Sequence, residues 1–495
     1  MGARFLLGID TGTSGSKGVL TDFTGHILGS HTTKHALIQP YPGWAEHDPE
    51  NQWWGDLITI VRQVLREAAI DPGDIGGISL SGLVPNLCPI DARGRPVRRA
   101  IIYRDNRAIN ESREINQRFN LALGTDAVTP KLLWLKRHEP ENYRQTLVVL
   151  NAHSYLAYKL TGNLSTDCDT ANIFGGIFDT VNLTWRTDLV KAMGLDPGKL
   201  PPVFRPTEVV GRVTPEAARV TGLAPGIPVV AGNGDSFMSL LGAGVVEPGE
   251  AMIYFGTAGT MLTCLTPLEK IAAGPAISSG QVQFLANILT GGELTRWFRE
   301  QVLLPSGSLD FTVLENMAQN IPPGSEGLII LPHLMGERTP INNPLARGVI
   351  LGLTTAHSGA HLYRALMESF GYALRDSYEQ ANIPVKRVVA TGGGATSPLW
   401  RQIVTDILGL SLEYVPRGDA ALGNAYFAGF ARGYFPDFKD LKNKWLQVED
   451  STFVNDANHS LYNRYFTLYR ELNTMIKPAF SQLARLGEIG PEREE

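Results

Sequence analysis

The stretch FLLGIDTGTSGSK, residues 5–17, decides the fold. A short apolar run ends at Asp10 and passes into glycines and hydroxyl residues, and a second apolar run begins at Gly18. This order predicts a strand, a tight loop and a second strand, and not the strand–loop–helix of a P-loop. Glycines let backbone N–H groups turn toward an anion, hydroxyls add donors, and Lys17 adds a positive charge. The segment is therefore either a phosphate-binding loop, with Asp10 available to a Mg²⁺ ion, or a glycine-rich hairpin turn.

A faint repeat of this pattern lies in the middle of the chain. Residues 254–260 read YFGTAGT and, like residues 8–15, follow a short apolar run and lead into another. A turn at 247–249 marks the boundary, so that residues 1–246 and 247–495 are predicted to be two α/β halves. Strand-like and helix-like segments alternate along the chain, which indicates sheets covered by helices. Two such halves would put their glycine loops face to face across a cleft.

Composition and charge indicate which classes of protein and partner can be excluded. The chain has 495 residues, of which 43% are hydrophobic and 19% charged, a globular balance. Its 44 Lys and Arg residues against 49 Asp and Glu give a formal charge of −5, which argues against nucleic acid as the main partner. The three cysteines form no CxxC pair and no disulfide framework, which fits a reducing compartment. No apolar run approaches the roughly 18 residues of a membrane helix, so we expect a cytoplasmic protein with no membrane partner.

Two further glycine turns follow apolar strands. Residues 228–236, PVVAGNGDS, present Asp235 before an apolar, helix-like segment. Its carboxylate either accepts a proton from a substrate hydroxyl or caps the helix, and the local sequence alone favours the cap. Residues 388–395, VVATGGGA, either let a ligand approach the backbone beside a helix N-terminus or form a tight strand-to-helix connection.

The end of the chain predicts one long helix. Residues 458–486 carry apolar side chains at helical spacing. The predicted stripe consists of Leu461, Tyr465, Leu468, Leu472 and Ile476. Core packing is the expected role of this stripe.

Taken together and in order, these segments resemble the FGGY family of carbohydrate kinases from about residue 5 to 433. The most specific match is the family's C-terminal signature at residues 348–368, and residues 131–138 match the core of its N-terminal signature. The loop GERTP at 336–340 is similar to the xylulokinase branch of the family. The resemblance implies a two-domain α/β fold of the actin-like, ribonuclease-H-like ATPase type, with a catalytic cleft between the domains. It also implies Mg²⁺-assisted phosphoryl transfer from ATP to a sugar or polyol hydroxyl, with a ketopentose such as xylulose expected first, and ribulose or another ketose or polyol as alternatives.

The resemblance also assigns roles to residues by position. Asp235 falls on the family's catalytic base, and Asp10 on the residue associated with Mg²⁺. The residues placed against the nucleotide and its phosphates are Thr13, Ser14, Lys17, Gly256, Thr257, Gly292, Gly393 and Gly394. Those placed against the sugar are Leu83, Val84, Asp105 and Asp235. At Leu83 and Val84 the chain is apolar where xylulokinases carry a Gln-Met-His-type stretch, because residues 83–86 read LVPN.

Two functions from other classes remain as alternatives. An actin- or chaperone-like ATPase acting on a protein partner shares the paired Gly-Thr loops, but it does not explain the two kinase signatures or Asp235. A catalytically silent sugar sensor would keep the fold, and the retention of Asp10, Asp235 and both loops argues against it. Relatives in this family are often homodimers, although the residues themselves do not indicate an oligomeric state.

Overall fold

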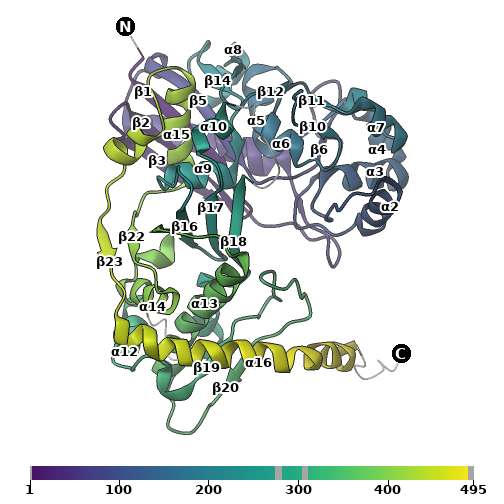
Figure 1. Ribbon diagram of the computed structural model, residues 1–495. Helices are drawn as coiled ribbons and strands as arrows, with labels where there is room; N and C mark the ends of the chain where they lie inside the picture. Colours follow the sequence, from purple (N-terminus) through teal and green to yellow (C-terminus); the bar gives the residue numbers. More distant parts are fainter. Residues whose placement is uncertain (1–2, 274–280, 304–309, 489–495) are drawn as a thin grey trace. The chain divides into compact units, whose positions relative to one another are not determined.

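The computed structural model describes residues 3–273, 281–303 and 310–488 (Figure 1). The chain forms two compact α/β units. Unit 1 consists of Met1–Val246, Thr266–Gln281 and Gly418–Leu446, and unit 2 of Glu247–Leu265, Val282–Arg417 and Gln447–Glu495. The units therefore depart from the contiguous halves 1–246 and 247–495, because two later segments are counted with the first unit.

A seven-stranded sheet forms the centre of unit 1. Its strands, in spatial order, are β13 (Val209–Arg212), β14 (Pro228–Val230), β5 (Ile75–Gly82), β1 (Phe5–Thr11), β2 (Gly15–Asp22) and β3 (Ile27–Lys34), with β15 (Asn233–Gly234) also paired to β5. β1 and β2 are antiparallel, with Asp10 opposite Lys17, and this confirms the predicted strand–loop–strand. β1 and β5 are parallel, which puts Ser81 beside Asp10.

Helices cover both faces of this sheet. A Cβ on Gly18 would lie 2.4 Å from a side-chain carbon of Ile60 in α1 (Gly55–Ala68), and one on Gly8 would lie 2.1 Å from the carbonyl oxygen of Ala421 in α15 (Ala420–Ala431). Gly18 is paired with Ile9, the neighbour of Gly8, and adjacent residues of a strand point to opposite faces. α1 and α15 therefore lie on opposite faces, and Figure 1 shows α15 beside β1 and β5.

Unit 2 repeats this topology. Its strands, in spatial order, are β18 (Val282–Ile288), β17 (Gly259–Cys264), β16 (Glu250–Phe255), β21 (Arg387–Thr391), β22 (Leu412–Tyr414) and β23 (Asp450–Thr452). β16 pairs antiparallel with β17 and parallel with β21, as β1 pairs with β2 and β5 in unit 1. The sequence repeat at 254–260 thus marks the same hairpin in a second sheet.

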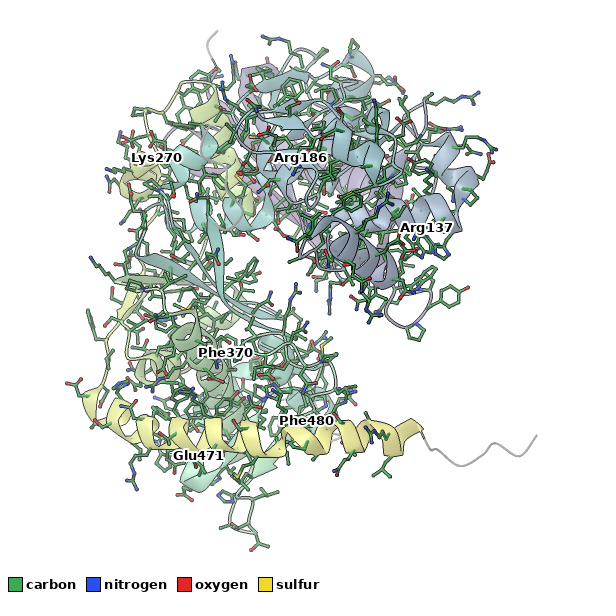
Figure 2. The ribbon with its side chains drawn as sticks, turned by 45° about the vertical axis from the view of Figure 1, so that its right-hand side comes forward. Arg137, Arg186, Lys270, Phe370, Glu471 and Phe480 are labelled. Carbon is green, nitrogen blue, oxygen red and sulfur yellow. The ribbon has the colours of Figure 1, made fainter. Side chains whose placement is uncertain are left out.

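Two long helices build much of the core of unit 2. Phe370, labelled in Figure 2, is buried in α13 (Gly359–Ala381), and a Cβ on Gly259 of β17 would meet its ring. α16 (Asp456–Glu488) confirms the predicted C-terminal helix, and Figure 2 labels its exposed Glu471 and its buried Phe480.

The predicted apolar stripe of α16 is confirmed in part. Leu472 is buried and Tyr465 and Ile476 pack half-buried against the core of unit 2, whereas Leu468 is 42% exposed. The buried face carries Tyr462, Phe466, Tyr469, Leu472 and Phe480. Tyr372 of α13 makes ring contacts with the first three of these side chains, so aromatic packing selects the face.

The remaining elements are shorter. The other helices of unit 1 are α2 (Ile109–Phe119), α3 (Val128–His138), α4 (Pro140–Gln145), α5 (Ala152–Thr161), α6 (Cys168–Asn172), α7 (Thr187–Ala192), α8 (Pro215–Thr221), α9 (Asp235–Gly242) and α10 (Leu268–Ala272). Those of unit 2 are α11 (Gly292–Trp297), α12 (Phe311–Gln319) and α14 (Pro398–Leu408). The short strands are β4 (Glu46–His47), β6 (Cys88–Ile90), β7 (Ala100–Ile101), β8 (Val148–Leu150), β9 (Thr166–Asp167), β10 (Phe178–Asp179), β11 (Thr184–Trp185), β12 (Val203–Phe204), β19 (Ile329–Leu331) and β20 (Val349–Leu351). None of the described helices combines the length and apolarity needed to cross a membrane.

Candidate active site

Asp10 and Asp235 are two half-buried carboxylates of unit 1. Burial raises the pKa of Asp10 to about 6, although its hydrogen bond with Ser81 acts in the opposite direction. Burial, and then the charge of Asp10, raise the pKa of Asp235 to about 7. Buried carboxylates whose pKa values lie near neutrality, one of them shifted by the charge of the other, are typical of sites that move protons.

Asp235 is not the N-cap residue that its local sequence favours. α9 begins at Asp235 itself, and the N-cap position belongs to Gly234, whose backbone is extended at φ −62° and ψ 157°. The Ser236 hydroxyl donates to Asp235 over 3.3 Å. The carboxylate therefore stands at the start of the helix without serving as its cap.

A buried chain of hydrogen bonds orients Asp10. Ser81 Oγ donates to Asp10 Oδ1 over 2.6 Å, and Asn424 Nδ2 donates in turn to Ser81 Oγ over 2.6 Å. Ser79 Oγ closes the chain by donating to Asn424 Oδ1 over 2.8 Å. Asn424 belongs to α15, in the segment that returns to unit 1. Sequence reasoning missed this residue, and its one signal was a polar side chain inside the apolar stretch AALGNAYFAG.

The first glycine loop is a tight turn with a paired lysine. Gly12 N donates to Gly15 O over 2.9 Å, and Ser14 is exposed. Thr13 Oγ1 lies 3.4 Å from the hydroxyl of Tyr103. Lys17 forms an ion pair with Asp419, so the predicted phosphate-binding lysine already has an anionic partner.

Two histidines that the sequence interpretation did not single out hold this loop. His35 Nδ1 lies 2.7 Å from Asp56 Oδ2, and its Nε2 lies 3.1 Å from Gly12 O. Both ring nitrogens of His35 therefore face oxygen acceptors, one on Asp56 and one on the loop.

His47 is the neutral partner in this pair. Trp53 Nε1 donates to His47 Nδ1 over 3.1 Å, which leaves the ring proton on Nε2, 3.1 Å from Thr13 O. Burial, and then the charge of His35, lower the pKa of His47 to about 4, consistent with this tautomer. The two histidine rings meet edge to face, with 4.9 Å between centroids.

The predicted sugar contacts at Leu83 and Asp105 do not fit the structure. Leu83 is 0% exposed within the apolar core of unit 1, so it has no surface for a sugar. Val84, by contrast, is half-buried and packs against Gly234, the residue before Asp235, because its Cγ2 lies 2.6 Å from where a Cβ on Gly234 would stand.

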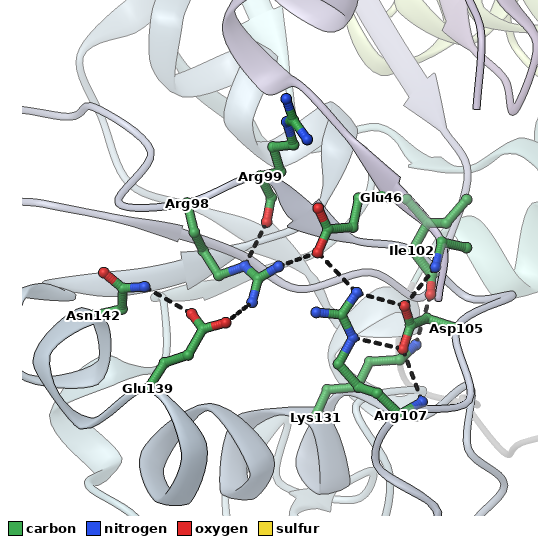
Figure 3. A network of polar contacts seen from close by, with 10 residues as sticks. Glu46, Arg98, Arg99, Ile102, Asp105, Arg107, Lys131, Glu139 and Asn142 are labelled. Atoms are coloured by element: carbon green, nitrogen blue, oxygen red, sulfur yellow. Dashed lines mark hydrogen bonds and ion pairs between the residues drawn. The ribbon is translucent and has the colours of Figure 1, made fainter. Parts of the chain in front are cut away.

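Asp105 belongs to a buried ionic network (Figure 3). It is 0% exposed, and both its oxygens accept hydrogen bonds from Arg107, at 2.8 Å from Nε and 2.7 Å from Nη2. Arg107 also bonds Glu46 over 2.8 Å, and Lys131 donates to Ile102 O over 3.0 Å. Burial lowers the pKa of Lys131 to about 7. We therefore assign Asp105 to the framework and not to substrate contact.

The glycines predicted to bind the nucleotide come together within unit 2. Gly292 N donates to Gly256 O over 2.7 Å, which joins the loop after β16 to the start of α11. Gly291 N and Glu293 N both donate to Thr257 O. β16 and β21 are parallel, so the loop with Gly393 and Gly394 follows at the same edge of the sheet.

These glycines differ in how tightly they are enclosed. A Cβ on Gly394 would lie 2.7 Å from the ring of Trp400, and one on Gly292 would lie 3.1 Å from Gly256 O. A Cβ on Gly393 would meet nothing within 4 Å, so the backbone there has an open face.

The described part of the chain contains no group of three or more His, Cys, Asp or Glu side chains arranged to hold a metal ion. Asp10 nevertheless has a suitable donor, because Oδ1 accepts from Ser81 and Oδ2 accepts no hydrogen bond from the described residues. Mg²⁺ is commonly held by one or two carboxylates together with substrate phosphates. The donor set at Asp10 fits that mode of binding.

Comparison with known proteins identifies the family. The N-terminal domain model of the FGGY family of carbohydrate kinases matches residues 5–242, and the C-terminal domain model matches residues 251–432. The xylulose kinase of Escherichia coli (strain K12) is 32% identical over an alignment that covers 95% of this chain and 99% of that protein.

Two solved structures confirm the predicted two-domain, actin-like fold. The gluconate kinase from Lactobacillus acidophilus matches with a TM-score of 0.84 and 26% identity, and the xylulose kinase from the same organism with 0.83 and 25%. Both alignments cover 97% of this chain and 99% of the other. The chain belongs to the FGGY family of carbohydrate kinases, and it is a sugar kinase with ATP as its phosphate donor.

Proposed function

We propose that the chain transfers the terminal phosphoryl group of ATP to a hydroxyl of a ketose or polyol, with Asp235 as the general base. The observation that carries this proposal is the environment of Asp235. Its carboxylate is half-buried at the start of α9, and burial and Asp10 raise its pKa to about 7. A base with a pKa near the working pH combines a large ionised fraction with a strong tendency to accept a proton.

In this reaction the protein mainly positions the reactants and stabilises charge. Phosphoryl transfer passes through a loose transition state, and the protein has little covalent chemistry to perform. Asp235 would accept the hydroxyl proton as the new P–O bond forms and as the bond between the β- and γ-phosphates breaks. ADP then carries away the electron pair of the broken bond.

The glycine loops of unit 2 are the proposed nucleotide site. Gly256, Thr257, Gly292, Gly393 and Gly394 present backbone at one sheet edge, with an open face at Gly393. The loop at Thr13 and Ser14 in unit 1 is the proposed second phosphate contact, with its carbonyl groups held by His35 and His47. The backbone N–H groups of this loop and the exposed Ser14 hydroxyl are the proposed donors to an anion.

Mg²⁺ is the proposed metal, held at Asp10. When bound there, it would neutralise charge on the phosphate oxygens of the nucleotide. The hydrogen bond from Ser81 fixes Oδ1 of Asp10 and leaves Oδ2 as the ligand atom. Lys17, paired with Asp419, adds positive charge next to this carboxylate.

A ketopentose such as xylulose is the proposed acceptor. The support is the E. coli relative, a xylulose kinase that is 32% identical over nearly the whole chain. A homodimer, and the absence of nucleic acid as a partner, stay predictions.

The test is substitution of the base. Asp235→Ala and Asp235→Asn are expected to bind ATP with the affinity of the parent protein and to lose at least a hundredfold in kcat, as is usual when a general base is removed. Asp188→Asn, at an exposed position in α7, is the matched control and should retain full activity. ADP release with a panel of ketoses and polyols measures turnover, and calorimetry measures ATP binding. Normal turnover in Asp235→Ala would reject the base assignment.

A further inference from the structure

Asp169 is a half-buried carboxylate that the proposed reaction does not use. It is the second residue of α6, which begins after the N-cap residue Asp167. Asp167 is committed to the fold, because it accepts from Thr170 N over 2.9 Å and contacts His153 Nε2 over 2.8 Å. The Asp169 carboxylate accepts one hydrogen bond within the described part of the chain, from Asn233 Nδ2 to Oδ2 over 2.6 Å. Its Oδ1 is left available.

Asn233 links this carboxylate to the proposed base. The two residues are separated by Gly234, whose backbone is extended at φ −62° and ψ 157°. Two residues of an extended chain separate their Cα atoms by at most about 7 Å. Asn233 therefore holds Asp169 from a position two residues before the proposed base. A sugar bound at Asp235 would then have Asp169, on the neighbouring element α6, as a second polar contact.

The same region contains another buried polar atom that lacks a protein partner. His153 is 0% exposed, and its Nδ1 makes no hydrogen bond with any described residue. The charge of His153 acts on Asp10, and its Nε2 contacts the cap residue of α6. Buried polar atoms are nearly always satisfied, so an unsatisfied one next to these carboxylates indicates a polar ligand or water.

The apolar segment at Val84 makes such a contact necessary. Val84 packs over Gly234, and Leu83 is enclosed in the core, so neither side chain offers a hydrogen bond to a sugar. A polyol is recognised by hydrogen bonds that must be matched when the site is closed to water. Recognition must then come from polar groups on other elements, and α6 supplies one.

The charges near Asp235 favour a neutral substrate. Burial, and then Asp167, raise the pKa of Asp169 to about 7, so that the carboxyl can both donate to and accept from hydroxyls. The basic groups that act on Asp10 are already paired, Lys17 with Asp419 and His153 with Asp167. The carboxylate of a sugar acid would therefore lie near acidic side chains, and neither Lys17 nor His153 would be free to neutralise its negative charge.

We propose that Asp169, held by Asn233, is a specificity-determining contact for the sugar hydroxyls that are not phosphorylated, and that it selects a neutral ketose or polyol over a sugar acid. This inference rests on the proposed function. It distinguishes between the substrates named for two similar structures, a xylulose kinase and a gluconate kinase, and favours the neutral sugar.

The test compares Asp169→Asn and Asp169→Ala with the parent protein. ADP release is measured with D-xylulose, D-ribulose and D-gluconate. In Asp169→Asn we expect the KM for the neutral ketose to rise at least tenfold, with kcat within about threefold and the KM for ATP unchanged. The ratio of kcat/KM for gluconate to that for the ketose should rise at least tenfold, because a negative charge is removed. Asp188→Asn is the control for a lost surface charge and should change none of these values.

The outcomes distinguish this inference from the proposed function. If the parent protein phosphorylates a ketose and Asp169→Asn leaves its KM unchanged, the role of Asp169 is wrong and the kinase assignment stands. If the parent protein prefers gluconate, the inferred substrate class is likewise wrong. If no sugar causes ADP release, both proposals fall. A melting temperature for Asp169→Asn within a few degrees of the parent protein shows that a raised KM reflects lost contact and not misfolding.

Discussion

Ser81 donates a hydrogen bond to Asp10 from the neighbouring parallel strand, with 2.6 Å between Ser81 Oγ and Asp10 Oδ1. The serine is itself fixed by Asn424, which reaches it from α15. A carboxylate held at one oxygen keeps a single orientation, and its other oxygen is then aimed consistently. The bond also holds the pKa of Asp10 below the value that burial alone would give.

Removing this bond should weaken the proposed metal site. In Ser81→Ala the pKa of Asp10 is expected to rise above about 6, because the interaction that lowers it is lost. A smaller fraction of Asp10 is then ionised at pH 7, and its orientation is less fixed. We expect the Mg²⁺ concentration for half-maximal activity to rise at least threefold, measured by ADP release at saturating ATP and sugar. Ser30→Ala, on an exposed position of β3, is the control, and an unchanged Mg²⁺ dependence in Ser81→Ala would contradict the assignment.

The activity should depend on pH through Asp235. A general base must be ionised, and burial and Asp10 raise the pKa of this carboxyl to about 7. kcat/KM is therefore expected to increase about tenfold per pH unit up to pH 7 and to level off above it. Below pH 6 the slope should steepen, because Asp10 also becomes protonated there. A profile that is flat from pH 5.5 to 8 would contradict a base with this pKa.

The same raised pKa predicts that the base destabilises the fold. The folded-state pKa of Asp235, about 7, lies above its ordinary value of 3.8, so the folded state prefers the protonated form. Stability from this group is thus fully present below pH 4 and is lost as the pH rises through 7. Asp235→Asn removes the charge and should be more stable than the parent protein at pH 8, by roughly 1–3 kcal/mol after allowance for solvent screening.

Melting temperatures at several pH values measure this effect. At pH 8 the Asn variant should melt about 2 °C or more above the parent protein. The difference should shrink as the pH falls toward 4, where both side chains are neutral. Asp188→Asn should show no such trend, and a variant that melts below the parent protein at pH 8 would contradict the prediction.

The sequence predicted those parts of the fold that repeat locally. The hairpin at residues 5–22 and its second copy at 254–260 are readable because glycine, hydroxyl and apolar residues alternate within a few positions. Residues 418–446 joined unit 1 without any such signal. α15 can pack closely on this sheet because Gly8 has no side chain. In the sequence this close approach is visible only as a glycine, which does not indicate which distant segment packs there.

Some residues of the candidate site were expected from the sequence, and others were not. Asp10 and Asp235 stand at strand and helix ends, where a short motif determines the geometry. His35 and His47 were missed because each acts on a carbonyl group of another segment, a contact that no local pattern encodes. Leu83 and Asp105 were placed against the sugar by resemblance, and three-dimensional packing assigned one to the core and the other to an ion pair with Arg107.

Two neighbouring glycines in unit 2 offer the sharpest test of the nucleotide site. A Cβ on Gly394 would lie 2.7 Å from the Trp400 ring and 3.1 Å from Phe255 Cβ, so Gly394→Ala must displace the core and should lower the melting temperature. A Cβ on Gly393 would meet nothing within 4 Å, so Gly393→Ala should melt within about 1 °C of the parent protein.

Gly393→Ala nevertheless places a methyl group on the open face where the nucleotide is proposed to lie. If ATP approaches the backbone there, the KM for ATP should rise at least tenfold while the KM for the sugar stays unchanged. Calorimetric titration with ADP measures the same loss without turnover, so a weakened affinity in a fully folded variant points to direct contact. Normal ATP affinity in Gly393→Ala would place the nucleotide elsewhere, because a ligand that touches this backbone cannot tolerate the added methyl group.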